Sequence, residues 1–300
     1  MSTSLEQSIL KTLCWFSVTD YPVTGFEIWK WLLEPDRVYD LSEVYRVLEL
    51  SEWLRFRMMS IDGHYSLRQE VPSSLSVRQE HYLDATRKYK KLRRAARFFS
   101  LFESVRAVAA VNSIAWWNTN ASSDIDLFII TKPGSIWSAR FWIVAPFILF
   151  GIRPHTESAN VQDPFCFSFF ASRSALKMEP LRLKEGDHYF AFWAKSIVPL
   201  FDRDGSIESF HRANVWAHTQ LPNVSIRHSS VPSFAPVRHS GLFESFYRSV
   251  QQKRFPNSIR SIANKDSRVV ITDDILKFHD LDRRAEFQKK YEETFKRVCA

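Results

Sequence analysis

Two short apolar segments separated by a polar loop restrict the fold of this 300-residue chain more than any other feature. The first is RAVAAV at 106–111, and the second is DIDLFIIT at 124–131; both have the composition of buried strands. The second segment begins with Asp124 and Asp126, whose carboxylates project from the same face of a strand, about 6.5–7 Å apart. A buried carboxylate is costly unless a partner or a metal ion compensates it. The pattern therefore predicts either an exposed strand end or a cation site at a sheet edge.

The segments that follow indicate how this pair of strands is completed. Pro133-Gly134 closes the second strand, an apolar helix is predicted at 135–152, and PFCFSFFAS at 164–172 reads as a third strand. Strand, loop, strand, helix and strand in this order predict an α+β core over residues 105–185, with a mixed sheet.

The N-terminal residues, 1–75, predict a small separate unit. Three helical segments precede two short extended runs joined by Asp62-Gly63, which is a strong hairpin signal. Three helices and a hairpin are typical of a winged-helix-like domain, which binds nucleic acid or other proteins. Because the third helix offers Arg46 alone among several acidic residues, a protein contact or a scaffold role is favoured over DNA binding.

A long helical pattern at 76–104 links this unit to the core, and it is strongly basic over 87–97. The cations are Arg87, Lys88, Lys90, Lys91, Arg93, Arg94 and Arg97. Two interpretations remain open: a solvated linker helix, because helical geometry spreads consecutive charges around the axis, or a phosphate-facing patch beside the active site. The net charge of +8 and the pI of about 9.4 make polyanions plausible partners.

The remaining residues, 186–300, predict a helical C-terminal region. DHYFAFWAKSIVPL at 187–200 and SIESFHRANVWAHTQL at 206–221 have helical patterns, residues 221–240 predict a linker, and 280–298 form an amphipathic helix.

Cysteine usage and hydropathy indicate the cellular compartment. Cys14, Cys166 and Cys299 are far apart and form no CxxC pair, which predicts reduced thiols rather than a disulfide framework or a zinc cluster. The N-terminus lacks the charged-then-apolar order of a signal peptide. The apolar run at 141–152 is shorter than the roughly 20 residues that a bilayer requires. We therefore expect a cytoplasmic protein with no membrane partner.

The polar loop between the two strands carries a further motif. Asn112-Ser113 ends the first strand, and ten residues separate Ser113 from Asp124. In order and spacing, AAVNS followed by SSDIDLFII resembles the nucleotidyltransferase superfamily of DNA polymerase β-like enzymes. Longer segments resemble an uncharacterised bacterial family in which a winged-helix-like region precedes a nucleotidyltransferase domain and a helical part follows.

The resemblance implies a set of site residues. Asp124 and Asp126 would be catalytic and would ligate one or two Mg²⁺ ions, while Ser113, beside Asn112, would contact the phosphates of a nucleoside triphosphate. Ser123 either shapes the turn before the acidic strand or donates to phosphate. Lys132, directly after that strand, either meets a triphosphate or is solvated.

The chain departs from the superfamily pattern at two places. Asn112 stands where a glycine is usual, although asparagine tolerates the left-handed backbone better than most residues. The third carboxylate of the superfamily has no counterpart in the strand 164–172, which offers Cys166 or Ser168 instead. Other acidic residues near this strand in sequence are Asp163, Glu157 and Asp187.

The function that the resemblance implies is Mg²⁺-dependent transfer of a nucleoside monophosphate to a hydroxyl of RNA, a protein or a small molecule. Two alternatives remain: a catalytically inactive nucleotidyltransferase-fold nucleotide sensor or assembly subunit, and a winged-helix nucleic-acid-binding regulator. The sequence leaves open the nucleotide, the acceptor and the oligomeric state.

Overall fold

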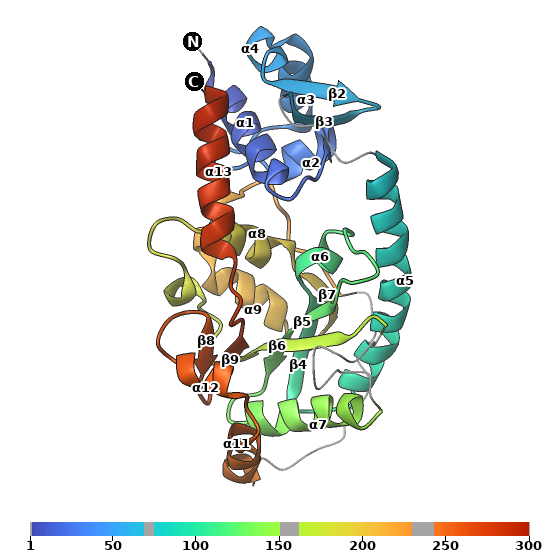
Figure 1. Cartoon of the computed structure of the whole chain (residues 1–300), viewed down its shortest axis with the longest axis vertical. Coiled ribbons are helices and arrows are strands. Elements are labelled where there is room, and N and C mark those ends of the chain that lie inside the picture. The colour runs from blue at the N-terminus through green and yellow to red at the C-terminus, as the bar shows by residue number, and fades with distance from the viewer. Residues whose placement is uncertain (1, 69–74, 151–161, 230–242, 300) are drawn as a thin grey trace.

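The helices and strands at the N-terminal end, which we call the N-terminal unit, carry a small sheet of their own in the computed structural model, which describes residues 2–68, 75–150, 162–229 and 243–299 (Figure 1). Its elements are α1 (Ser4–Ser17), β1 (Val23–Thr24), α2 (Gly25–Lys30), α3 (Leu41–Leu50), α4 (Glu52–Arg55), β2 (Met58–Ile61) and β3 (His64–Leu67). The three strands form an antiparallel sheet in the order β1-β3-β2.

Local sequence signals explain where these elements begin and turn. Thr24 and Asp40 begin α2 and α3 with capping boxes, in which a glutamate three residues on returns a hydrogen bond. Asp62 and Gly63, between β2 and β3, have φ values of 49° and 73°. Positive φ at both central residues defines a type I′ turn, which matches the twist of a hairpin. The predicted helices and hairpin are confirmed.

The linker helix, α5 (Leu75–Phe99), runs from the N-terminal unit along one side of the larger sheet (Figure 1). It ends at Phe99, and its buried side chains, among them Leu92 and Ala96, pack on the sheet.

The larger sheet has six strands in the order β7-β4-β5-β6-β9-β8. They are β4 (Val105–Ala110), β5 (Ile125–Thr131), β6 (Phe165–Ser172), β7 (Val198–Asp202), β8 (Val269–Ile271) and β9 (Ile275–Phe278). Only the β5–β6 pair is parallel, and α7 (Ile136–Leu149) connects these two strands as a crossover helix. The described chain is therefore a mixed α/β structure with a mixed sheet.

Strand alternation divides the core between the two faces of this sheet. Ile125, Leu127 and Ile129 belong to the apolar cluster that includes residues of α5 and α7. Phe128 and Ile130 belong to the cluster on the other face, beneath α8 (His188–Ser196). The predicted inward orientation of the three aliphatic residues is confirmed, so Asp126, which lies between Ile125 and Leu127, belongs to the opposite face.

The C-terminal region is not purely helical, and this expectation was wrong for three segments. Residues 198–202 form β7, and β8 and β9 also join the sheet, so strands from both sides of the boundary at 185/186 share one core. The helices of this region are η1 (Glu179–Leu181), α8, α9 (Ser206–Ala213), α10 (Val215–Gln220), α11 (Glu244–Lys253), α12 (Asn257–Ile262) and α13 (Arg284–Cys299).

Two local features explain these differences. Proline has no N–H to donate to a neighbouring strand, so it is found on edge strands rather than central ones. Pro199 lies in β7, which is an edge strand of the sheet. The segment predicted as one helix at 206–221 breaks at Asn214, whose buried amide donates to Leu176 O and Phe210 O at 2.7 and 2.8 Å. Residues 221–229 have no regular structure, and the rest of the predicted linker, from 230, lies outside the described residues.

The C-terminal helix joins the N-terminal unit to the core. α13 packs against α1, and Arg57 Nε donates to Val298 O at 3.1 Å. Trp15 of α1 stacks on Phe192 of α8 with ring centroids 4.9 Å apart and meets Tyr291 of α13 edge-on. Aromatic burial of this kind holds the N-terminal unit in a defined position rather than on a free tether.

All three cysteines are free thiols, as expected. Across the described ranges, no helix combines the length and the apolar character needed to cross a bilayer.

Candidate functional site

The pairing of β4 with β5 brings the end of the first strand beside the start of the second. Ala110 lies opposite Leu127, and Val111 N donates to Asp126 O at 3.1 Å. As a result the Asn112 side chain hydrogen-bonds the carboxylate of Asp126. Two sequence-predicted site residues that are fourteen positions apart thus meet at one sheet edge, because antiparallel strands place the end of one at the start of the other.

Asn112 adopts the left-handed conformation, with φ 56°. Asparagine is one of the few residues other than glycine that takes up this conformation readily. Tyr189 of α8 donates its hydroxyl to Asn112 Oδ1 at 3.2 Å, so the same amide contacts an acid on one side and a phenol on the other. Ser113 follows, partly exposed, in the one-turn helix α6 (Asn112–Ala115).

Asp126 is the more perturbed member of the acid pair. Its side chain lies opposite Cys166 in the parallel strand β6 and accepts a hydrogen bond from that thiol. The pKa of Asp126 is raised to about 6, mainly by burial; the hydrogen bonds from Asn112 and Cys166 oppose this rise, and the neighbouring Asp124 adds to it. Burial also raises the pKa of the more exposed Asp124, with Lys88 acting in the other direction.

The loop that leads into Asp124 is held by one buried lysine of α5. Lys88 is fully buried, and its Nζ donates to Asn120 O at 2.5 Å and to Ser123 O at 2.7 Å. Asp84 lies 3.0 Å from the same ammonium. Part of the basic run therefore has an internal structural role that neither interpretation of the sequence had anticipated.

The acidic residues considered as a third metal ligand have other partners. Asp163 pairs with Arg87 Nη2 at 2.7 Å, and its carbonyl accepts from Lys91 at 2.8 Å. Asp187 caps α8 and lies 2.7 Å from Arg284. Glu157 is outside the described residues. The position opposite Asp126 is occupied by Cys166, and no group of three His, Cys, Asp or Glu residues in the described ranges is arranged to hold a metal ion.

The two remaining candidate phosphate contacts do not both lie at this edge. Ser123 shapes the turn, because its Oγ accepts from Asn120 N at 3.0 Å. Lys132 lies at the opposite end of β5, roughly 25 Å along the strand from Asp124, and its Nζ is 3.3 Å from Glu103. A nucleotide contact by Lys132 is therefore incompatible with a site at Asp124, since the strand carries the two residues to opposite edges of the sheet.

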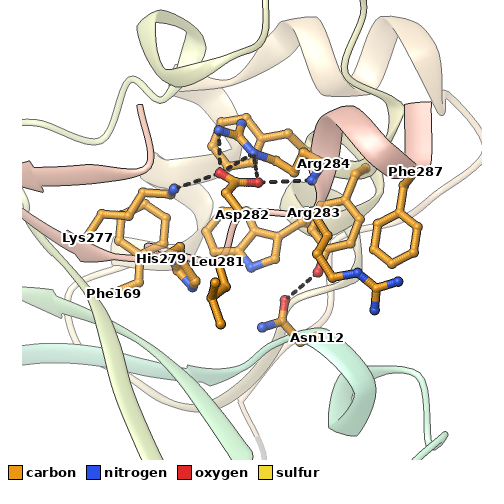
Figure 2. A pocket seen from close by; sticks show the side chains of 12 residues that line it. Asn112, Phe169, Lys277, His279, Leu281, Asp282, Arg283, Arg284 and Phe287 are labelled. Atoms are coloured by element: carbon orange, nitrogen blue, oxygen red, sulfur yellow. Dashed lines mark hydrogen bonds and ion pairs between the residues drawn. The ribbon is translucent and has the colours of Figure 1, made fainter. Parts of the chain in front are cut away.

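A cavity of about 320 Å³ opens beside Asn112 (Figure 2). Five Phe, Tyr or Trp side chains line it, and the C-terminal segment from β9 to α13 supplies a charged side. The lining residues are Asn112, Phe169, Tyr189, Phe190, Trp193, Lys277, His279, Leu281, Asp282, Arg283, Arg284 and Phe287. A second cavity of about 210 Å³ shares Asn112 and Tyr189 with the first and is also lined by Ser113 and by Phe16 of the N-terminal unit.

Buried charges on the C-terminal side of the first cavity compensate one another. Arg284 lies 2.7 Å from Asp187 and 2.9 Å from Asp282, and Lys277 Nζ lies 3.4 Å from Asp282. Burial and the nearby Arg284 lower the pKa of Lys277 to about 8. His279 contacts Ser168 Oγ through Nε2 at 3.1 Å, and its buried Nδ1 has no hydrogen-bond partner within the described structure. Burial lowers the pKa of His279 to about 3, so this ring is neutral at physiological pH.

Sequence reasoning missed the C-terminal side of this cavity. Residues 277–287 fell within the predicted helical C-terminal region, and no motif distinguishes Lys277, His279 or Arg284 from other polar residues. Only the return of the chain through β9 brings them opposite Asn112.

Searches against known proteins add no relative: neither a protein family model, nor a curated protein, nor a solved structure matches the chain.

Proposed function

We propose that this protein is a nucleotidyltransferase of the DNA polymerase β-like kind, with a winged-helix-like N-terminal unit, that transfers a nucleoside monophosphate to a hydroxyl acceptor. The observation that carries the proposal is the meeting of Asn112-Ser113 with Asp124 and Asp126 at one edge of a mixed sheet. The cavity next to Asn112 supports it, because its volume and aromatic side chains suit a nucleotide; Asn112, which hydrogen-bonds Asp126, links the cavity to the acid pair, whose own side chains do not line it.

The acid pair has the chemistry of a magnesium site. Carboxylate oxygens are the donors that Mg²⁺ prefers, and no ion pair among the described residues involves Asp124 or Asp126. The raised pKa values of both groups come mainly from burial, which disfavours the charged form, and a divalent cation would offset this cost. When bound there, Mg²⁺ would supply charge stabilisation for the phosphoryl group.

The residues of the chain itself would position the nucleotide. Ser113, which is partly exposed and follows the left-handed Asn112, would contact the phosphates, and Tyr189 hydrogen-bonds the Asn112 amide that contacts Asp126. In such a site the protein contributes mainly alignment of the acceptor hydroxyl and electrostatic stabilisation.

A nucleotide sensor or assembly subunit without turnover is the second candidate, and Cys166 is the observation that favours it. This thiol lies opposite Asp126, where a further carboxylate would complete the metal site. Burial and the neighbouring Asp126 raise the pKa of Cys166, so the thiol stays protonated and is a poor ligand. DNA recognition by α3 has less support, because Glu43 and Glu49 accompany Arg46 on that helix.

Labelled nucleotides test the proposal and separate the two candidates. With Mg²⁺ and cell extract, we expect α-³²P-labelled nucleoside triphosphates to label an acceptor, γ-labelled ones to leave it unlabelled, and EDTA to abolish the signal. Calorimetry with Mg²⁺ and a non-hydrolysable triphosphate should show binding in both cases. Binding without labelling across many acceptors would favour the sensor, and absence of binding would refute both.

A further inference from the structure

The basic run on α5 separates into two sets of side chains with different surroundings. Three of these cations contact the core or the loop before Asp124: Lys88 is buried, Lys91 is partly buried, and Arg87 is exposed but pairs with Asp163. The other four cations, Lys90, Arg93, Arg94 and Arg97, are exposed to solvent. These four take part in none of the ion pairs found among the described residues. The one acidic residue between 82 and 99 is Asp84, and it pairs with Arg87 and Lys88.

These four exposed cations, which we call the α5 stripe, lie on one face of the helix. Their spacing of three, four and seven residues follows the helical repeat and covers about 10 Å along the axis. Stabilisation by the helix dipole reaches only the last turn, so it accounts for Arg97 but not for Lys90 or Arg93. Four like charges kept close together without anionic partners repel one another, which is unfavourable unless a polyanion binds them.

An exposed aromatic platform lies on the same helix, two turns before the stripe. Trp117 stacks on Tyr82 and on Tyr89, with centroid distances of 5.1 and 4.4 Å. Tyr82 and Tyr89 are about 10 Å apart along α5, so Trp117 lies between them and Tyr82 is the outer ring of the stack. Tyr82 remains 53% exposed, which leaves room for a further planar group.

We propose that Tyr82 and the α5 stripe form a docking surface for a single-stranded nucleic acid. The four cations contact successive backbone phosphates, and a base stacks on Tyr82. Unpaired cations combined with a stacking platform are the elements that single-strand binding proteins use. A membrane surface fits less well, because the exposed residues of α5 from 87 to 97 are all cations, and Leu83 is the one exposed aliphatic side chain of this helix, which is too little apolar surface to insert into a bilayer.

The proposed nucleic-acid docking goes beyond the proposed nucleotidyl transfer and does not depend on it. Its surface contains neither member of the acid pair, and it requires neither a metal ion nor nucleotidyl transfer. Docking is therefore expected to survive in Asp124→Asn, so the two proposals fail independently.

Fluorescence anisotropy with a labelled 15-nucleotide single-stranded RNA, without Mg²⁺ or nucleotide, tests the surface. Raising the salt from 50 to 200 mM should weaken binding by the full-length protein about 50-fold, since four contacts predict a log–log slope near −3. Replacing Lys90, Arg93, Arg94 and Arg97 with alanine should weaken binding at least tenfold and make the slope nearly flat. Tyr82→Ala should weaken binding about tenfold with the slope unchanged.

The matched control removes four exposed cations elsewhere, by replacing Lys253, Arg254, Arg260 and Lys265 with alanine. It has the same net charge as the stripe variant and should bind the RNA like the wild type. Equal losses in the two variants would overturn the proposal, because net charge alone would then explain binding. So would stripe-dependent binding to vesicles of anionic phospholipid in the absence of RNA binding.

Discussion

Asp126→Asn should lower Mg²⁺-dependent transfer by at least about 10³-fold and, at neutral pH, make the protein more stable. The loss follows because a metal ligand contributes several kcal/mol of charge stabilisation, and about 1.36 kcal/mol corresponds to a factor of ten. The gain follows because asparagine fills the same space beside Asn112 and Cys166 without a charge that burial disfavours.

The pH dependence of this gain has a definite sign. The pKa of Asp126 rises from 3.8 to about 6 on folding, so the folded state disfavours the charged form. Below the unfolded pKa both states are protonated and the two proteins should be equally stable. The advantage of the asparagine variant appears as the pH rises from about 4 to 6 and then stays constant. Because Asp126 is partly exposed, we expect about 1–2 kcal/mol rather than the full value of the shift.

Thermal unfolding between pH 3.5 and 8 measures the difference in stability between the two proteins. The same experiment with Mg²⁺ measures how much the metal ion stabilises each of them. Mg²⁺ should stabilise the wild type through binding to the folded state and should leave Asp126→Asn unchanged. Asp62→Asn is the matched control, since this exposed acid in the β2–β3 turn has φ 49° and lies outside the site. An asparagine variant less stable than the wild type at pH 7.5, or equally sensitive to Mg²⁺, would contradict the assignment of Asp126.

Lys88→Met should lower the free energy of unfolding by about 3–5 kcal/mol, because two carbonyl oxygens lose their buried donor, at about 1–3 kcal/mol each, and Asp84 keeps only its ion pair with Arg87. The ammonium of this fully buried lysine satisfies two carbonyl oxygens of the 118–123 loop and lies against Asp84. Methionine fills a similar volume but donates no hydrogen bond. Because the same loop precedes Asp124, we also expect weaker binding of Mg²⁺ and nucleotide.

Urea denaturation of Lys88→Met beside Lys90→Met isolates this effect. Lys90 is two residues away on the same helix but is exposed, so its replacement should change stability by less than about 0.5 kcal/mol. Similar midpoints for the two variants would mean that the buried network around Lys88 does not form as described.

Local patterns predicted the elements near the site well. The alternation in DIDLFIIT correctly separates Ile125, Leu127 and Ile129 from the acids, because a strand has a strict period of two. The Asp62-Gly63 turn and the caps at Thr24 and Asp40 depend on backbone preferences of single residues, which the sequence displays directly. For the same reason, Asn112 was a reasonable residue for a left-handed turn.

Other assignments failed because they depend on contacts between distant segments. Lys132 is an exception, because the sequence itself indicates its position: it follows the strand that Asp124 precedes, so the two residues lie at opposite ends of that strand. The apolar stretch at 198–202 fits a buried helix or a strand, and pairing with β4 selects the strand. Likewise the division of the basic run into buried and exposed cations depends on which face of α5 packs against the sheet.

By itself the sequence determined the two-residue acid motif, the strand that carries it and the turn at Asn112, since each arises from preferences within a few neighbouring residues. Tertiary structure alone decided that Cys166 lies opposite Asp126, that Lys88 holds the preceding loop, and that Lys277, His279 and Arg284 enclose a cavity beside Asn112. The physical reason is that burial and charge compensation are properties of the packed chain. They depend on segments that lie up to about 170 positions apart in the sequence, from Asn112 to Arg284.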